Sequence, residues 1–138
     1  SSRNTRSTRL LVVEQPELLE KMSKMRDYGS SFMKDAQAAI VVMGDKSASD
    51  LWLDNCAITA TILQLAVVDE GLASCWVHVN DRPCLKDEPE GAKADDYLRE
   101  LLSLPEHYGV LCAVALGYSD FEPKPLPEYE GEERVMWK

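Results

Sequence analysis

A chain of 138 residues, with 45% hydrophobic and 28% charged residues, has the composition of a single globular domain and not that of a disordered protein. Its net charge of −9 argues against nucleic acid or an anionic membrane as a partner, because phosphate groups are bound by basic surfaces. The sequence contains no apolar run of about 18 residues, the length that a membrane-spanning helix needs.

Apolar runs and polar turns alternate through the first third of the chain. The polar turn SSRNTRST is followed at residues 10–14 by LLVVE, which predicts a short buried strand. Pro16 then begins a segment with apolar residues at helical spacing, which predicts a helix that ends near Arg26. The continuous apolar run AAIVVMG at residues 38–44 predicts a central strand covered on both faces.

Residues 50–70 predict the longest helix of the chain. The segment contains neither Pro nor Gly, and as a helix it would span roughly 30 Å. Its apolar residues fall on two adjacent faces, so we expect a helix that is buried along most of its circumference. Ser49 or Asp50 is the expected N-cap, and Gly71 is the expected left-handed residue that ends the helix.

The second half of the chain predicts two further strands and one helix. Residues 74–79 and 108–117 are apolar and predict strands, and residues 94–102 predict a short amphipathic helix. Residues 80–93 carry prolines, a glycine and many charges, which predicts a surface loop and a candidate mobile lid. The order strand, helix, strand, long helix, strand, helix, strand favours a layered sheet with helices on its faces, without fixing the strand directions.

The end of the chain predicts a tail and not a part of the core. Three prolines and an acidic run leave this segment little apolar surface to bury. Val135 and Trp137 are anchors that we expect to pack on another surface, including that of a second subunit. We therefore divide the chain into a core domain at residues 1–118 and an extended tail at residues 119–138.

No self-sufficient active site is visible in the sequence. The four cysteines show no CxxC spacing and neither histidine has a cysteine at ligand spacing, which argues against a zinc site and for reduced thiols in the cytoplasm. Motifs for a nucleophilic serine or for nucleotide phosphates, such as GxSxG and GxGxxG, are missing. Asp54 and Asp69 are expected to be solvated or capping residues. We therefore assign no catalytic residue and no metal, and expect a bound cofactor to do the chemistry if the protein is an enzyme.

Four stretches of the chain together resemble the FMN-dependent nitroreductase family. GLASCWVHV at residues 71–79, with the preceding helix WLDNCAITATILQLAVVDE, resembles the family's GLGSCW signature. SSRN at residues 1–4 resembles its PSSxN turn, and YLRELLSLPEHYGVLCAVALGY at residues 97–118 resembles its helix, LPE turn and final core strand. The proline-rich tail fits as well, so the resemblance covers nearly the whole chain in the expected order.

The resemblance implies an α+β fold, a nitroreductase-like sheet flanked by helices, in an intertwined homodimer. Two FMN molecules would sit at the subunit interface, each touched by both chains, so the long helix would form part of the interface. Asp54, Asn55 and Gln64 interrupt this helix and are therefore the first candidates for contacts across that interface. Members pass hydride from NADH or NADPH to FMN and then to a nitroaromatic, a quinone or a related small acceptor. The sequence leaves the acceptor and the choice of NADH or NADPH open.

By position, the resemblance implies three groups of flavin contacts. The turn that contacts the isoalloxazine ring is formed by Ser1, Ser2 and Asn4, and Arg6 would add a cation near the flavin pyrimidine. The backbone that lies along the flavin edge near N5 belongs to Trp76, Val77, His78 and Val79. In the tail, Arg134 is the implied partner of the FMN phosphate.

Three of these side chains also have a second interpretation. Trp76 also fits a core side chain, His78 an exposed residue at a strand end, and Arg6 a solvated cation. Members of the family also begin with a helical segment bearing an Arg-Arg-Ser-x-Arg motif that grips the FMN phosphate, and this sequence starts at Ser1, after it. We therefore expect an N-terminal segment to be absent from this sequence. The alternative function is that of a degenerate dimer that is cofactor-free or binds flavin without turnover.

Overall fold

The protein is built on a four-stranded sheet in which every neighbouring pair of strands is antiparallel. The computed structural model describes residues 1–122, 124–129, 131 and 133–138. The strands follow the order β1-β2-β4-β3 across the sheet, and are β1 (Thr8–Val13), β2 (Ala38–Asp45), β3 (Ala73–His78) and β4 (Tyr108–Gly117). The run at residues 38–44 is thus a central strand, as predicted.

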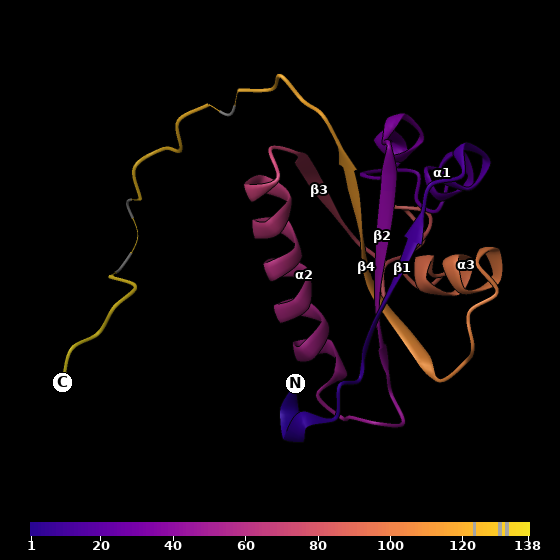
Figure 1. Ribbon diagram of the computed structural model, residues 1–138, viewed down its shortest axis with the longest axis horizontal. Helices are drawn as coiled ribbons and strands as arrows, with labels where there is room; N and C mark the ends of the chain where they lie inside the picture. The colour runs from indigo at the N-terminus through magenta and orange to yellow at the C-terminus, as the bar shows by residue number, and fades with distance from the viewer. Residues whose placement is uncertain (123, 130, 132) are drawn as a thin grey trace.

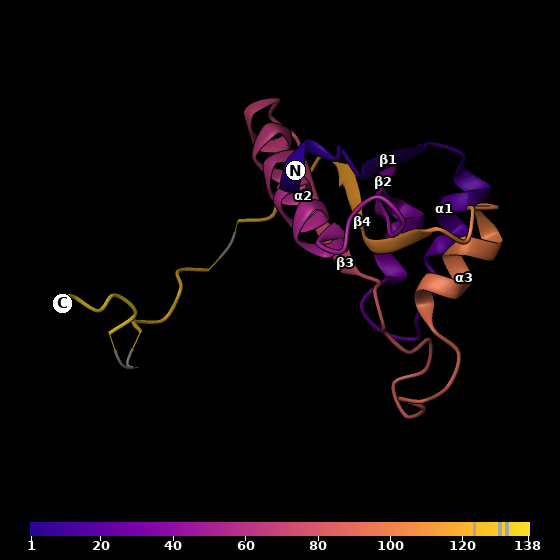
Figure 2. The same ribbon diagram turned by 90° about the horizontal axis from the view of Figure 1, so that it is seen from below.

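Helices cover both faces of the sheet (Figure 1). They are α1 (Pro16–Met22), α2 (Trp52–Asp69) and α3 (Ala94–Leu101), with short 3₁₀ turns η1 (Ser2–Asn4) and η2 (Ser31–Asp35). Helices α1 and α3 lie on one face and α2 lies on the other, as Figure 2 shows from below. The predicted α+β class, with helices on the faces of a layered sheet, is therefore confirmed. Among the described residues, no helix combines the length and the apolar character needed to cross a membrane.

The prediction that the first helix ends near Arg26 was wrong by about one turn, since α1 ends at Met22. The serine hydroxyls that follow explain this. The Ser23 hydroxyl donates to the carbonyl of Glu20 at 2.7 Å, and the Ser30 hydroxyl donates to the carbonyls of Ser23 and Arg26 at 2.9 and 3.0 Å. Side-chain bonds of this kind offer the backbone an alternative to the helical ladder, so the chain turns back instead.

Two apolar clusters make up the core, one on each face of the sheet. On the face of α1 and α3 the fully buried side chains include Met22, Met25, Met33, Val41 and Leu98. On the face of α2 the buried members are Val42, Cys56, Ala60, Leu111, Cys112 and Val114. Trp52 and Trp76 pack against this second cluster from α2 and from β3.

Gly71 ends α2 in the way the sequence predicts. Its φ of +71° is left-handed, its N–H donates to the carbonyl of Val68, and the next N–H, that of Leu72, donates to Val67 at 2.9 Å. These two bonds form a Schellman motif. The start of the helix differs from the prediction, because Leu51 occupies the N-cap position and no side chain caps the helix there. The Ser49 hydroxyl accepts a hydrogen bond from the Leu51 N–H at 3.2 Å, but Ser49 lies two residues before the N-cap and so does not cap the helix.

The expectation that α2 is buried along most of its circumference was wrong for the single chain. Only one side of the helix contacts the sheet, and its buried residues are Asn55, Cys56, Ala60 and Val67. Ile62 and Leu65 on the opposite side are 61% and 67% exposed, and Ile58 and Val68 are exposed as well. A four-stranded sheet covers one face of a helix and leaves an apolar stripe uncovered. We call these four residues the α2 stripe.

Beyond β4, the described residues of the tail form no helix or strand and extend away from the rest of the chain (Figure 1). Leu126, Met136 and Trp137 are among its exposed apolar side chains. By contrast, the loop at residues 80–93, predicted as a lid, is tied by a β-bridge between Pro83 and Lys93 and by a hydrogen bond from the Cys84 N–H to Ala92 at 2.8 Å.

Two glycines make room for Trp52 on the sheet. Gly44 and Gly109 lie opposite each other on β2 and β4, and a Cβ added to Gly109 would overlap the Trp52 indole ring. Gly109→Ala is therefore expected to lower the free energy of unfolding by about 1–3 kcal/mol, measured by chemical denaturation. Gly117→Ala is the matched control, because its Cβ would meet nothing nearer than Gln37 Cγ at 3.7 Å. Equal losses for the two variants would contradict this packing.

Candidate functional site

The N-terminal turn gathers four of the predicted flavin contacts, Ser1, Ser2, Asn4 and Arg6, on one loop. The Arg6 N–H donates to Ser1 Oγ at 2.9 Å, and the Arg6 Nε–H donates to Asn4 Oδ1 at 3.4 Å. Asn4 and Arg6 have φ angles of +54° and +49°, which L residues adopt rarely and chiefly in tight turns. Ser2 lies in the same 3₁₀ turn. The side chains of Ser1, Asn4 and Arg6 are thus exposed to solvent and hydrogen-bonded around one another.

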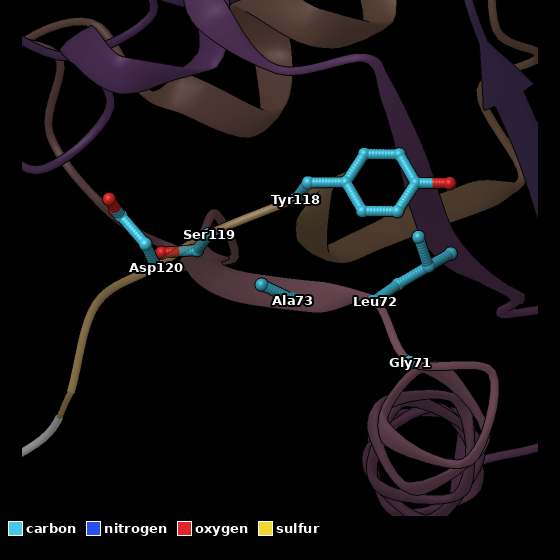
Figure 3. Close-up of a pocket in the computed structure, with 6 residues that line it drawn as sticks. All are labelled: Gly71, Leu72, Ala73, Tyr118, Ser119 and Asp120. Carbon is cyan, nitrogen blue, oxygen red and sulfur yellow. The ribbon is translucent and has the colours of Figure 1, made fainter.

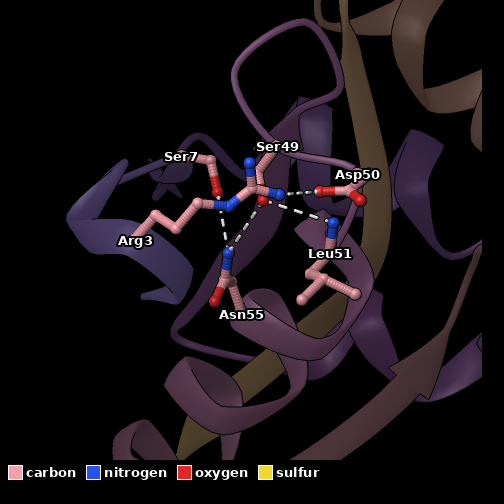
Figure 4. Close-up of polar contacts among 6 residues, drawn as sticks. All are labelled: Arg3, Ser7, Ser49, Asp50, Leu51 and Asn55. Carbon is pink, nitrogen blue, oxygen red and sulfur yellow. Dashed lines mark hydrogen bonds and ion pairs between the residues drawn. The ribbon is translucent and has the colours of Figure 1, made fainter.

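Asn55 anchors this turn to α2 from within (Figure 4). Its amide donates to Ser7 Oγ at 3.1 Å and to Ser49 Oγ at 3.5 Å, and the Asn55 residue is only 5% exposed. Outside this buried group, Arg3 pairs with Asp50 at 3.2 Å. Asn55 thus makes a buried contact within the chain, and its contact across an interface stays a prediction. Gln64 likewise donates to Ser74 Oγ at 3.5 Å, whereas Asp54 is exposed.

The side chains of β3 alternate between the two faces of the sheet. Val77 and the following Val79 are buried in the core beneath α1 and α3, whereas Trp76 packs on the side of α2. The rings of Trp76 and His78 are nearly parallel, with 8° between their planes and 6.4 Å between their centroids. Trp76 is thus in part a core side chain, and His78 is a half-buried residue at the strand end.

Burial lowers the pKa of His78, and the positive charges of Arg82 and Arg26 lower it further. The imidazole is therefore neutral at pH 7, since even its ordinary pKa lies below that pH. The buried thiols of Cys56 and Cys112 have their pKa values raised to about 11 and about 12 by burial. They are protonated and unreactive at neutral pH. The described residues contain no cluster of histidine, cysteine or carboxylate side chains that could hold a metal ion.

The backbone of β3 presents hydrogen-bonding groups at the edge of the sheet. The Val79 N–H donates to the carbonyl of Leu111 on β4 at 3.0 Å. Because bonded and non-bonded pairs alternate along an antiparallel ladder, Val77 also bonds to β4, while the N–H and C=O groups of Trp76 and His78 point away from it. No other strand of the described chain pairs on that side. Of the four predicted backbone residues, Trp76 and His78 thus offer outward donors, and Val77 and Val79 do not.

The three predicted groups of contacts are not brought together within one chain. The N-terminal turn and the end of β3 lie toward the same end of the sheet, but they belong to its two opposite edge strands, β1 and β3, which are three strand spacings or about 14 Å apart. Arg134 lies in the tail, which extends away from the rest of the chain (Figure 1), and its guanidinium carbon lies 4.0 Å from the centre of the Tyr129 ring.

A cavity lies at the end of the sheet away from the N-terminal turn, and none of the predicted flavin contacts lines it. It has a volume of about 470 Å³ and is lined by Gly71, Leu72, Ala73, Tyr118, Ser119 and Asp120 (Figure 3). An adjoining groove of about 570 Å³ runs past Phe32 and Phe121. No sequence pattern predicted either one, because both form where the start of β3 and the end of β4 meet the start of the tail.

Residues 3–118 match the nitroreductase family. The chain belongs to this family. The family assignment predicted from the four stretches is thereby confirmed, and it supports an oxidoreductase.

Individual relatives agree with this assignment. Two curated proteins, from Archaeoglobus fulgidus and Methanothermobacter thermautotrophicus, are 34% and 32% identical over 97% and 89% of this chain, and both carry the provisional name NADH dehydrogenase/NAD(P)H nitroreductase. The chain spans 72% and 61% of their lengths.

Solved structures show the same fold. The FMN-dependent nitroreductase from Clostridium difficile R20291 is 36% identical, with a TM-score of 0.84 over 93% of this chain and 72% of its own. A protein from Parabacteroides distasonis ATCC 8503 with the same provisional name as the curated relatives is 25% identical, with a TM-score of 0.81 over 99% of this chain and 77% of its own.

The buried amide of Asn55 is expected to hold the N-terminal turn in place. Asn55→Ala removes the donor to the fully buried Ser7 hydroxyl and should lower the free energy of unfolding by about 1–3 kcal/mol. Asp54→Ala, at the exposed neighbouring position, should change it by less than about 0.5 kcal/mol. Urea denaturation followed by tryptophan fluorescence measures both, and a tolerated Asn55→Ala would show that the turn is held by other contacts.

Proposed function

We propose that this protein is an FMN-dependent oxidoreductase that passes hydride from NADH or NADPH, through the flavin, to a nitroaromatic, quinone or similar small acceptor. The observation that carries the proposal is the open edge of β3, where the N–H groups of Trp76 and His78 point away from the sheet. Bound FMN would supply the redox chemistry, which the side chains of this chain do not provide.

The donors at this edge fit the chemistry of a flavin. One long edge of an isoalloxazine ring carries hydrogen-bond acceptors, including N5, and outward N–H groups recur at every second residue of a strand. A neutral His78 beside Trp76 adds a flat, uncharged surface next to these donors. We therefore assign the flavin edge to the backbone of residues 76–79, with His78 and Trp76 as the donors and Val77 and Val79 as the buried residues that fix the strand.

The N-terminal turn fits the polar end of the same ring. Ser1 and Asn4 expose hydrogen-bonding side chains, and we place Ser2 of the same turn with them. Arg6 brings a cation that would favour an anionic reduced flavin. Arg134 is a guanidinium suited to a phosphate group, and we propose that the tail carries it to the FMN phosphate across the subunit interface.

A homodimer accounts for the exposed α2 stripe. It also accounts for the separation of the N-terminal turn from the β3 edge within one chain. The stripe is apolar, exposed and continuous along one side of the helix, as expected for a surface that another chain covers. A second copy would bury it and bring the N-terminal turn of one chain near the β3 edge of the other. Each flavin would then be touched by both chains.

The backbone donor can be tested by a variant that removes it. His78→Pro deletes an N–H that points away from β4, so it should leave the ladder intact, and proline is tolerated on edge strands. We expect FMN to bind at least tenfold more weakly, measured by quenching of flavin fluorescence. His78→Ala keeps the N–H and removes only the ring, so it should lose much less FMN affinity than His78→Pro. A chain with no flavin absorbance, before or after incubation with FMN, would overturn the proposed function itself.

The dimer interface can be tested separately. Ile62→Lys places a charge in the centre of the α2 stripe and should raise the dimer dissociation constant at least tenfold, or about 1.4 kcal/mol. Analytical ultracentrifugation over a range of concentrations measures this. Leu85→Lys is the control, because Leu85 is also exposed but lies in the loop at residues 80–93. Unchanged dimerisation of Ile62→Lys would place the interface elsewhere.

A further inference from the structure

Arg26 contacts the β3 edge at the residue that offers the outward N–H. Arg26 comes four residues after the end of α1, and its Nη1 donates a hydrogen bond to the carbonyl of His78 at 3.0 Å. The guanidinium lies 4.0 Å above the ring of Tyr28, which fixes its plane. Its Nε is buried and has no hydrogen-bond partner among the described residues. The bond to the His78 carbonyl is therefore made by a guanidinium that is only partly satisfied.

This contact fixes the peptide group that joins His78 to Val79. The C=O of that peptide accepts from Arg26, and its N–H donates to the carbonyl of Leu111 at 3.0 Å. With both ends held, the peptide plane cannot rotate without breaking a hydrogen bond. The outward N–H of His78 belongs to the preceding peptide and is joined to this one through the same Cα, so its direction is constrained as well.

Asp27, the residue after Arg26, holds the loop at residues 80–93. The Asp27 N–H donates to the carbonyl of Cys84 at 2.8 Å, and the Lys86 N–H donates to the Asp27 carboxylate at 3.1 Å. Neighbouring residues therefore serve different segments. Arg26 holds the end of β3, and Asp27 holds the loop that follows it.

We propose that Arg26 is a positioning residue for the flavin, acting through the His78 carbonyl to hold the His78 N–H in the direction that a flavin acceptor requires. This inference rests on the proposed function. A firmly directed donor at N5 favours oxidised FMN, because reduced FMN carries a hydrogen on that atom. Arg26 thereby sets the balance between the two oxidation states without touching the flavin.

Substitutions at Arg26 separate positioning from charge. Arg26→Met keeps an apolar stem and removes the guanidinium, and Arg26→Lys keeps the charge but loses the planar group that stacks on Tyr28. For both variants we expect the affinity for oxidised FMN to fall about tenfold while that for reduced FMN stays unchanged. That raises the midpoint potential of bound FMN by about 30 mV for a two-electron couple. Spectroelectrochemical titration measures the potential.

Other outcomes would overturn the proposal. A lower potential for Arg26→Met with no change for Arg26→Lys would mean that the charge acts directly, and an unchanged potential in both would mean that Arg26 serves only stability. Asp27→Ala is the matched control at the neighbouring residue, since it removes the carboxylate that accepts from the Lys86 N–H and leaves His78 untouched. We expect Asp27→Ala to leave the midpoint potential unchanged. An equal rise of the potential in Asp27→Ala would assign the effect to the whole segment around residues 26 and 27 and not to Arg26.

A readout without flavin keeps this proposal distinct from the proposed function. In the FMN-free chain, Arg26→Met should speed hydrogen exchange of the Val79 amide at least tenfold, whereas Asp27→Ala should not, as measured by NMR. If exchange responds in this way but no variant and no unchanged protein binds FMN, the contact stands and the proposed function fails. If FMN binds and exchange is unchanged in Arg26→Met, the positioning role is overturned.

Discussion

The unpaired edge of β3 is the feature on which the rest of this structure depends. An exposed strand edge is a row of unsatisfied donors and acceptors, and proteins usually cover or blunt such edges because other chains can pair with them. Here the opposite side of β3 is fixed along its length by β4, a fully central strand. The position of the edge is therefore set by whatever fixes β4, including the Trp52 ring packed over Gly109.

Helix α2 connects this edge to the N-terminal turn. Its inner side packs on β2, β3 and β4, and near its start the buried Asn55 holds the loop that precedes β1. Its outer side is apolar and bare. A single helix thus contributes to the core, to the placement of the turn and to a surface suited to a second chain. This explains why its residues are apolar almost all the way round, although one chain buries only one side.

Secondary structure was largely predictable here because its signals are local. The continuous apolar runs gave the strands, and Gly71 marked the end of α2, since a left-handed closing residue is a property of a few neighbouring residues. The early end of α1 was missed because the Ser30 hydroxyl reaches back across seven residues. The buried role of Asn55 depends on a partner, Ser7, that lies 48 residues away, and no local pattern reports such a contact.

The candidate site was predictable as a set of residues but not as an arrangement. Resemblance pointed to residues 76–79 as one segment, whereas the strand order and register divide them into outward and inward pairs. Arg26 gave no signal either, because the sequence places it only near the end of the first helix, and only the tertiary structure brings it to the His78 carbonyl.

The separation of the turn from the β3 edge has a thermodynamic consequence under the proposed function. The two edge strands lie about 14 Å apart in one chain, so we place a planar ring that both groups contact between two chains. A two-fold contact along the α2 stripe is isologous, and it forms both such sites at once. Flavin binding and dimerisation then stabilise each other by mass action, because a ligand that binds only the dimer shifts the association equilibrium toward it. Weakening the stripe should therefore weaken flavin binding even though no residue of the stripe belongs to the flavin site.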